Sequence, residues 1–190
     1  MPLSQVSRKG SLPRPITPSN WLYTHTSVAT MIIDQIKPNQ VNEVSNLIQR
    51  NLLEINSKDY PPDVIAYLVD CFTPKNILEN MKAQEIFVAI QKDIVVGTGG
   101  LANFGGDENP SYYGVAIFVA PEHHRQGIGK QLMNAVEAKA VELGADKITV
   151  RAAIGAQKFY EKLGYQYFDG KEVLNERGNY IMVKELQNQQ

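Results

Sequence analysis

The order of apolar and polar residues predicts alternating strands and helices after residue 30. Apolar residues three and four positions apart indicate amphipathic helices, which we expect over 39–52, 61–69, 73–81, 128–143 and 155–163. Short β-branched or apolar segments indicate strands over 31–36, 86–90, 94–101, 112–119, 147–151, 165–168 and 180–184. Strands that alternate with helical crossovers predict one α/β (α+β) domain, in which a mixed sheet carries helices on both faces.

Capping and turn residues predict where several of these elements begin and end. Asn39 has a side chain suited to an N-cap, and Pro62 suits the first helical position of the next helix. Thr73 precedes a proline and predicts a further helix start, while Gly164 predicts a helix end with a left-handed residue. The polar residues 91–93 predict the turn of a β-hairpin.

The first 30 residues differ in composition from the rest of the chain. They contain four prolines, many Ser and Thr, the basic residues Arg8, Lys9 and Arg14, and no acidic residue, so residues 31–190 carry a net charge of −4. This composition predicts a disordered basic arm over 1–30 and a single domain over 31–190. Two alternatives stay open: an organelle transit segment, or an over-long start with Met31 opening the domain.

The overall composition is that of a soluble globular protein. The chain has 190 residues, of which 43% are hydrophobic and 21% charged, and its formal net charge is −1. No apolar run approaches the roughly 18–20 residues of a membrane span. A charge near zero argues against general nucleic-acid binding. We therefore expect a cytoplasmic protein with neither a membrane nor a nucleic acid as partner.

Cysteine and histidine usage predicts neither a disulfide nor a metal site. Cys71 is the only cysteine, so it has no partner within the chain, and we expect a small core residue there. His123 and His124 are neighbours on a polar loop, and no His/Cys cluster accompanies them. Adjacent residues of an irregular loop rarely converge on one ion, so we expect no metal.

The segment 119–132, VAPEHHRQGIGKQL, joins a predicted strand to a predicted helix through two glycines. The first turn of a helix has backbone N–H groups without partners, and its dipole favours negative charge. Gly127 and Gly129 would let a ligand approach the backbone without meeting a Cβ atom. The pattern predicts a pyrophosphate-binding loop, with a loop that only turns the chain as the alternative.

Two other nucleotide-binding loops are excluded by single positions. A Walker loop needs Ser or Thr after Gly-Lys so that a hydroxyl can hold magnesium, and here Gln131 follows Lys130. A dinucleotide fingerprint needs a third glycine where this chain has Leu132, and it opens a domain instead of lying two-thirds of the way along it.

A second motif follows the predicted strand 147–151. The segment 155–165, GAQKFYEKLGY, places Ala156, Phe159, Tyr160 and Leu163 on one helical face. In their order and spacing, V-x-P-E-x-x-x-x-G-x-G and A-x-x-F-Y-E-K-L-G-Y resemble the GNAT superfamily of acetyl-CoA-dependent N-acetyltransferases, over roughly 31–186. The resemblance implies a twisted, mostly antiparallel central sheet, acetyl-CoA as the donor with CoA as product, and no metal. It leaves open whether the protein forms a homodimer.

The resemblance also implies roles for individual residues. Tyr160 matches the tyrosine that protonates the departing thiolate, since a tyrosine with a pKa of about 10 is protonated at neutral pH. The strand before the glycine loop would be splayed from its neighbour and would pair with pantetheine. The residues implied in cofactor binding are Phe118, Val119, His124, Arg125, Gln126, Gly127, Ile128, Gly129, Lys130 and Tyr160.

Three positions depart from the family's pattern. His124 stands where Arg or Gln is usual, Arg125 where a glycine is common, and Ala153 where an Asn often helps to orient the cofactor. The strand 112–119 also lacks the acidic residue that serves many relatives as general base. The base is therefore open, and the candidates on the acceptor side are Glu54, Asp59, Glu108 and His123.

These observations predict an acetyltransferase that moves an acetyl group from acetyl-CoA to a primary amine of a small molecule or protein, by direct transfer in a ternary complex. The alternative is a CoA-binding sensor or scaffold module without catalysis. The acceptor and the acyl chain length stay open. We expect the acceptor site to be built from residues 50–80, the loop 103–111 and the C-terminal strands.

Overall fold

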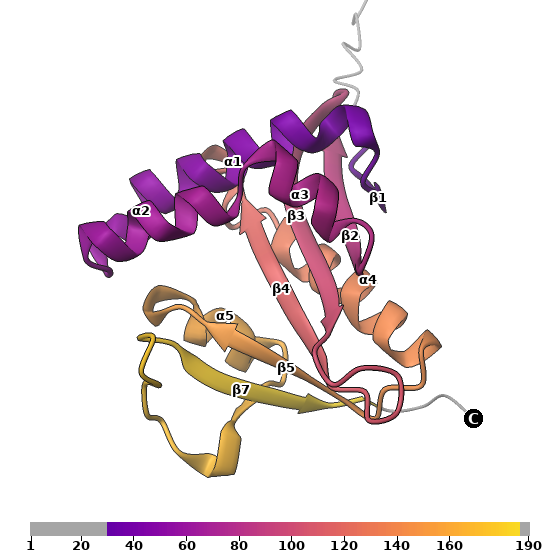
Figure 1. Cartoon of the computed structure of the whole chain (residues 1–190), viewed down its shortest axis with the longest axis vertical. Helices are drawn as coiled ribbons and strands as arrows, with labels where there is room; N and C mark the ends of the chain where they lie inside the picture. The colour runs from indigo at the N-terminus through magenta and orange to yellow at the C-terminus, as the bar shows by residue number, and fades with distance from the viewer. Residues whose placement is uncertain (1–29, 187–190) are drawn as a thin grey trace, which may run out of the picture.

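The computed structural model describes residues 30–186, so the predicted N-terminal arm lies outside the described residues apart from Thr30. The described part contains one sheet of seven strands (Figure 1). These are β1 (Ile32–Gln35), β2 (Gln84–Gln91), β3 (Ile94–Asn103), β4 (Tyr112–Val119), β5 (Lys147–Ala152), β6 (Gln166–Tyr167) and β7 (Tyr180–Glu185). Their order in the sheet is β1-β2-β3-β4-β5-β7-β6. Only β4 and β5 pair in parallel, which confirms the mixed, mostly antiparallel sheet.

Helices cover both faces of this sheet, as expected. The α-helices are α1 (Val41–Glu54), α2 (Pro62–Cys71), α3 (Pro74–Asn80), α4 (Ile128–Glu142) and α5 (Gln157–Lys162). Short 3₁₀ turns are η1 (Pro38–Gln40), η2 (Asn56–Lys58), η3 (Pro121–His123), η4 (Ile154–Ala156) and η5 (Phe168–Gly170). Figure 1 shows α1, α2 and α3 together on one side of β2, β3 and β4, with α4 behind the sheet.

Each face of the sheet has its own apolar core. Val44 and Ile48 of α1 pack with Val88 of β2 on the first face. Met133 of α4 packs with Ile148 of β5 on the second, and α5 joins this second cluster. All five side chains are at most 1% exposed. The amphipathic periods that predicted the helices thus correspond to the two buried layers.

The predicted element ends are mostly confirmed. The Thr73 hydroxyl accepts a hydrogen bond from the Asn76 N–H at 3.3 Å, as an N-cap does. Gly164 ends α5 with φ = 89°, and the Tyr165 N–H donates to the Tyr160 carbonyl at 3.0 Å in a Schellman motif.

The prediction that Asn39 caps the first helix is wrong. Asn39 lies inside the 3₁₀ turn η1, and the residue before α1 is Gln40, which has no side-chain cap bond. Instead the Gln40 Oε1 atom accepts from the Lys37 N–H at 2.8 Å. The added turn moves the start of the α-helix past the asparagine.

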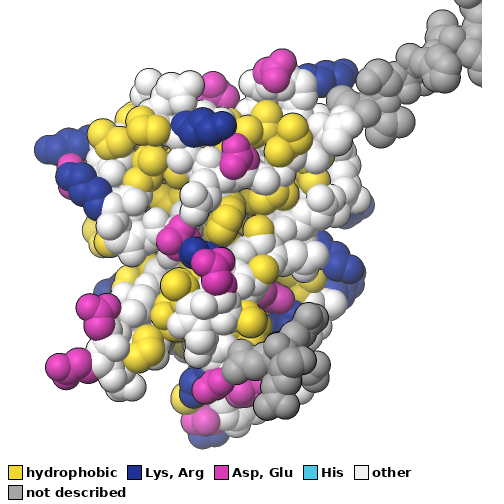
Figure 2. All heavy atoms as spheres, turned by 90° about the vertical axis from the view of Figure 1, so that its right-hand side faces the viewer, with side chains coloured by type: hydrophobic (Ala, Val, Ile, Leu, Met, Phe, Trp, Pro, Cys, Tyr) yellow, Lys and Arg dark blue, Asp and Glu magenta, His cyan; other side chains and the backbone are white. Residues whose placement is uncertain are grey.

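Charged side chains of both signs are interspersed on the face of the molecule shown in Figure 2, with apolar side chains between them. Within residues 30–186, no helix combines the length and apolar character needed to cross a membrane. In the same residues, no three His, Cys, Asp or Glu side chains come together as metal ligands would.

Candidate functional site

The middle strand of the sheet is less buried than its neighbour. Eight of the ten residues of β3 are buried, whereas Gly114 is the only buried residue of the eight in β4. A strand at the centre of a sheet with helices on both faces is normally covered on both sides. Seven of the eight β4 residues are thus only partly buried, in contrast to β3.

The backbones of β4 and β5 separate after two paired positions, a separation called the β4–β5 cleft below. Tyr113 pairs with Thr149 and Gly114 with Val150, and the parallel ladder ends there. Figure 1 shows the two strands diverging from this point. On its other side, β5 continues to pair with β7 as far as Ala152. The stretch 115–119 thus has a strand partner on the β3 side and none on the β5 side.

A β-bulge interrupts β4 at the start of the cleft. The register with β3 passes from Gly100–Val115 to Thr98–Phe118, so β4 has one extra residue opposite Gly99. Ala116 lies in this bulge with φ = 52°, a left-handed conformation that is unusual for alanine. Such a bulge leaves backbone groups outside the ladder, and here they lie beside the separated strands.

The loop after β4 leads to a helix N-terminus without a side-chain cap. Gly127 precedes α4 with φ = 81° and accepts from the Gln131 N–H at 3.1 Å. Among the described residues, the N–H groups of Ile128, Gly129 and Lys130 have no hydrogen-bond acceptor. Free N–H groups at a helix start bind anions well.

Two polar side chains of this loop contact backbone carbonyl groups of the same segment and so stabilise its conformation. His124 Nε2 lies 2.9 Å from the Val119 carbonyl oxygen, and Gln126 Nε2 donates to the Glu122 carbonyl at 3.2 Å. Arg125 and Lys130 are exposed and form no ion pair with any described residue. Of the charged side chains in this loop, Arg125 and Lys130 are therefore available to bind an anion.

Arg125 adopts the conformation that the family's usual glycine would favour. Its φ is 61°, in the left-handed region that costs an L-residue about 1–2 kcal/mol. The departure seen in the sequence is thus a local backbone strain, at the centre of the candidate phosphate loop.

The other predicted cofactor residues contribute through backbone or packing. The Ile128 side chain is 3% exposed and belongs to the core, and the partly buried Phe118 packs edge-to-face on Phe72 at 5.9 Å, against the core of the first face. A Cβ atom on Gly129 would lie 3.1 Å from the Phe159 ring. Gly129 is thus needed for the contact between α4 and α5, whether or not a ligand approaches it.

Tyr160 is buried where α5 packs on the second core. It is 7% exposed, and its ring packs edge-to-face on Phe159 at 5.0 Å and on Tyr165 at 5.5 Å. Burial raises the pKa of the Tyr160 hydroxyl well above the value of about 10 assumed from the sequence. The hydroxyl therefore stays protonated throughout the physiological pH range.

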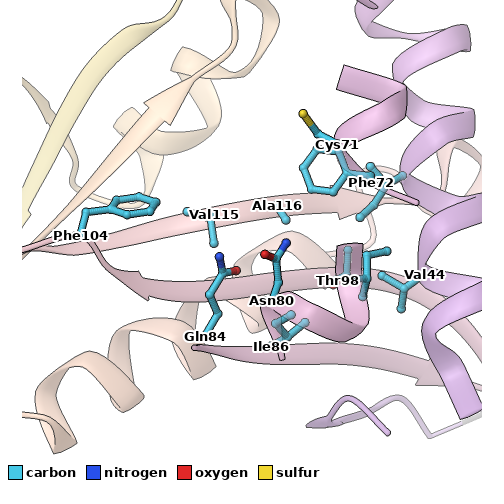
Figure 3. Close-up of a pocket in the computed structure, with 12 residues that line it drawn as sticks. Val44, Cys71, Phe72, Asn80, Gln84, Ile86, Thr98, Phe104, Val115 and Ala116 are labelled. Atoms are coloured by element: carbon cyan, nitrogen blue, oxygen red, sulfur yellow. The ribbon is translucent and has the colours of Figure 1, made fainter. Parts of the chain in front are cut away.

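A cavity of about 210 Å³ lies between α1, α2 and α3 and the sheet, next to the bulge (Figure 3). Figure 3 shows the Asn80 and Gln84 side chains directed toward Val115 and Ala116 of β4. Cys71 is half-buried and belongs to this lining, so its prediction as a core residue is wrong. The lining contains no Asp, Glu, Lys, Arg or His: it is Val44, Ile48, Cys71, Phe72, Ile77, Asn80, Gln84, Ile86, Thr98, Phe104, Val115 and Ala116.

None of the candidate bases suggested by the sequence lines this cavity. Glu54 pairs with Arg50 at 3.1 Å, and Glu108 is exposed in the loop after β3. Asp59 lies beside Gly155, 3.4 Å from the point where a Cβ atom would stand. His123 lines a separate hollow next to α1.

An ion pair ties the phosphate-loop region to α1. The Arg50 guanidinium donates to both carboxylate oxygens of Glu122, at 3.0 and 2.5 Å. These hydrogen bonds lower the pKa of Glu122 to about 2. Glu122 therefore links the start of the loop to α1.

A contact that sequence reasoning missed joins the loop between α1 and α2 to the loop before β7. The Tyr60 hydroxyl donates to the Gly178 carbonyl at 3.0 Å and accepts from Asn179 Nδ2 at 2.9 Å. The partners are 118 and 119 positions apart, so no local pattern announces the contact. It connects the helical layer over β2–β4 with the β5–β7 part of the sheet.

Known proteins share both sequence and structural features with this chain. Residues 82–167 match the family model of the acetyltransferase (GNAT) domain, and no curated protein matches the chain significantly. The PaiA N-acetyltransferase from Thermoplasma acidophilum, solved with coenzyme A, is similar with a TM-score of 0.70 at 14% identity, over 82% of this chain and 99% of that chain. A GNAT acetyltransferase from Staphylococcus aureus Mu50 gives 0.66 at 20% identity, over 83% and 100%.

A third similar structure is an aminoglycoside 6'-N-acetyltransferase complexed with coenzyme A, with a TM-score of 0.61 at 18% identity, over 82% of this chain and 97% of that chain. The family resemblance drawn from two sequence motifs is confirmed. Residues 82–167 match the acetyltransferase (GNAT) domain, and the chain has the fold of these GNAT acetyltransferases.

Proposed function

We propose that the protein is an acetyltransferase that binds acetyl-CoA between β4 and β5 and transfers the acetyl group to a primary amine in a ternary complex. The observation that carries this proposal is the loss of β4–β5 pairing at the centre of the sheet, directly before an uncapped helix N-terminus. The PaiA and aminoglycoside enzymes, which share the fold, were both solved with coenzyme A.

Two parts of coenzyme A match the two parts of this site. The amide groups of pantetheine would pair with the free edge of 115–119 as an added strand does. The pyrophosphate would bind the free N–H groups of Ile128, Gly129 and Lys130, with Arg125 and Lys130 adding positive charge.

The chemistry is aminolysis of a thioester. The neutral amine attacks the acetyl carbon, the carbonyl oxygen becomes an oxyanion, and backbone N–H groups at the Ala116 bulge would stabilise it. Collapse of this intermediate breaks the C–S bond, the thiolate takes a proton from Tyr160, and water then returns a proton to the Tyr160 phenolate. Because no carboxylate lines the cavity, the proton released by the amine passes to water.

The raised pKa of Tyr160 keeps its hydroxyl protonated when the thiolate leaves, and it also makes that hydroxyl a weaker acid than an ordinary tyrosine. An acid that stays protonated to high pH keeps its proton available over the whole assay range. We therefore expect no loss of kcat from Tyr160 ionisation below about pH 10, where an unshifted tyrosine would begin to titrate.

The test is Tyr160→Phe with Tyr165→Phe as the matched control. Both residues belong to one aromatic cluster and are at most 7% exposed, and both substitutions remove a hydroxyl and keep the ring. Tyr160→Phe should lower kcat by about 10²–10⁴ with little change in CoA affinity, the range for loss of a general acid. Tyr165→Phe should keep kcat. Wild-type kcat in Tyr160→Phe would contradict the assignment and leave water as the proton donor.

A non-catalytic CoA-binding module is the second candidate. It is favoured by the uncharged cavity and by Ala153, which replaces the Asn that often orients the cofactor. Calorimetry with CoA and a turnover assay over a broad amine panel separate the two functions. Tight CoA binding without turnover on any amine would support the module over the enzyme.

A further inference from the structure

Arg151 lies at the point where β4 and β5 separate. It follows Val150, the last β5 residue that pairs with β4. Because side chains alternate along a strand, Arg151 shares a sheet face with Thr149 and with its partner Tyr113. Val115, two positions beyond Tyr113, lines the cavity, so Arg151 lies on the cavity's side of the sheet.

Two aromatic rings hold the Arg151 side chain at this place. Its guanidinium carbon lies 5.3 Å from the centroid of Phe104 and 5.0 Å from that of Tyr113. The two rings are themselves in contact, with centroids 5.2 Å apart. Stacking of this kind positions a guanidinium and leaves the N–H donors at its edge free.

No described residue neutralises this guanidinium. Arg151 is exposed, and its side chain forms neither an ion pair nor a hydrogen bond with any residue of 30–186. Arg50, in contrast, pairs with the carboxylates of both Glu54 and Glu122. A positioned, unpaired guanidinium offers the forked donors that bind a carboxylate or a phosphate group.

Phe104 connects Arg151 to the cavity, since the same ring also lines it. Figure 3 shows Phe104 at the end of the cavity away from Cys71 and Phe72. The lining supplies apolar surface and two neutral amides but no carboxylate. An acceptor with several positive charges would find no counter-charge here and would meet the Arg151 cation at one end.

We propose that Arg151 binds an anionic group of the acceptor, so that the acceptor is an amine with an apolar body and a carboxylate or phosphate. This inference rests on the proposed function, which places the acetyl group at the Ala116 bulge. Tyr113, which holds Arg151, is three residues before that bulge, or about 10 Å at 3.3 Å per residue. The anion thus lies further from the amine than in a free α-amino acid, at a separation typical of a short peptide.

The experiment compares matched acceptors with the full-length protein. The probes are the dipeptide Ala-Phe, its C-terminal amide, glucosamine 6-phosphate, glucosamine and spermidine, and release of the CoA thiol is measured. Wild type should prefer Ala-Phe over its amide by about 10- to 100-fold in kcat/KM, through KM, the range of one charged hydrogen-bonded contact. The phosphate pair shows whether a phosphate replaces the carboxylate.

Arg151→Gln should abolish this preference without lowering kcat on the amide, and Arg151→Lys should keep part of it. CoA affinity, measured by calorimetry, should not change in either variant. Equal use of acid and amide by wild type, a preference that survives Arg151→Gln, or turnover limited to neutral amines and spermidine would each overturn the inference while the proposed function stands. Absence of both CoA binding and turnover would overturn the proposed function itself.

Discussion

β3 and β4 are neighbours in one sheet and have opposite environments. β3 is buried over most of its length and pairs with β2 on one side and β4 on the other. β4 is only partly buried and loses its second partner after Gly114. Buried backbone groups are nearly always hydrogen-bonded, so a central strand without a partner indicates that something else completes it. We therefore expect the proposed ligand to bind beside β4 and not beside β3.

A glycine of β3 and the glycine that ends the loop after β4 have different surroundings. A Cβ atom on Gly97 of β3 would lie 3.0 Å from Leu132 of α4, so this glycine allows the helix to pack closely on the sheet. Gly127, at the end of the loop after β4, has no atom within 4 Å of its Cβ position. One glycine serves packing and the other leaves open space in front of a helix N-terminus.

The largest expected difference comes from one substitution made on both strands. Val96 of β3 is 3% exposed, whereas Val115 of β4 is half-buried and lines the cavity. Val96→Ala should lower the free energy of unfolding by about 2 kcal/mol, from two lost methyl groups and the space that they leave. Val115→Ala should cost less than about 1 kcal/mol and should instead change KM for the acceptor. Urea denaturation and steady-state kinetics check both, and equal stability losses would remove the contrast.

The next effect concerns the open glycine. Asp and Asn both tolerate a left-handed conformation, so Gly127→Asp and Gly127→Asn share the backbone cost at φ = 81° and differ in one charge. Repulsion of the pyrophosphate should weaken CoA binding about tenfold or more in the Asp variant relative to the Asn variant. Calorimetry gives the two affinities. Equal affinities would show that no phosphate lies in front of α4. Variants at Gly129 cannot replace this test, because a side chain there would also clash with the Phe159 ring.

A smaller effect is expected from the strain at Arg125. Arg125→Gly and Arg125→Ala both remove the positive charge, but only glycine accepts φ = 61° without cost. The glycine variant should be more stable than the alanine variant by about 1 kcal/mol in urea denaturation. The two variants should bind CoA with the same affinity. Equal stability would mean that the loop relaxes at this position.

The smallest effect is the pH dependence of the Arg50–Glu122 pair. Hydrogen bonds from Arg50 lower the pKa of Glu122 from an ordinary 4.5 to about 2. A lowered carboxylate pKa stabilises the folded state fully above the ordinary value, and this contribution is lost as the pH falls toward 2. Because both side chains are exposed, Glu122→Gln should lower Tm at pH 7 by only about one to two degrees. The difference from wild type should vanish near pH 2, and a constant difference would exclude the ion pair as its cause.

Local patterns predicted the elements of the fold, while contacts between distant segments were beyond them. Apolar periodicity located the five α-helices and the strands to within about two residues, because it records which face is buried. The Ala116 bulge gives no such signal, since nothing in an apolar strand marks an alanine for a left-handed conformation.

The candidate site was predictable only in its contiguous parts. The glycine loop and the segment with Tyr160 are short motifs, and the structure brings them together where Gly129 faces the Phe159 ring. The stacking of Arg151 on Phe104 joins residues from β5 and the loop after β3, and the Tyr60 contact joins two loops. Such sites exist only once the sheet has formed. The uncharged character of the cavity likewise depends on which side chains the fold brings together.

The central claim is that CoA completes β4 in the β4–β5 cleft, and hydrogen exchange with and without CoA tests it most directly. Saturating CoA should slow amide exchange in peptides that cover 115–119 and 125–130. It should leave the paired segment 94–101 of β3 unchanged, because those amides already have partners. Slower exchange only outside the cleft and the loop, or no change at millimolar CoA, would contradict the account.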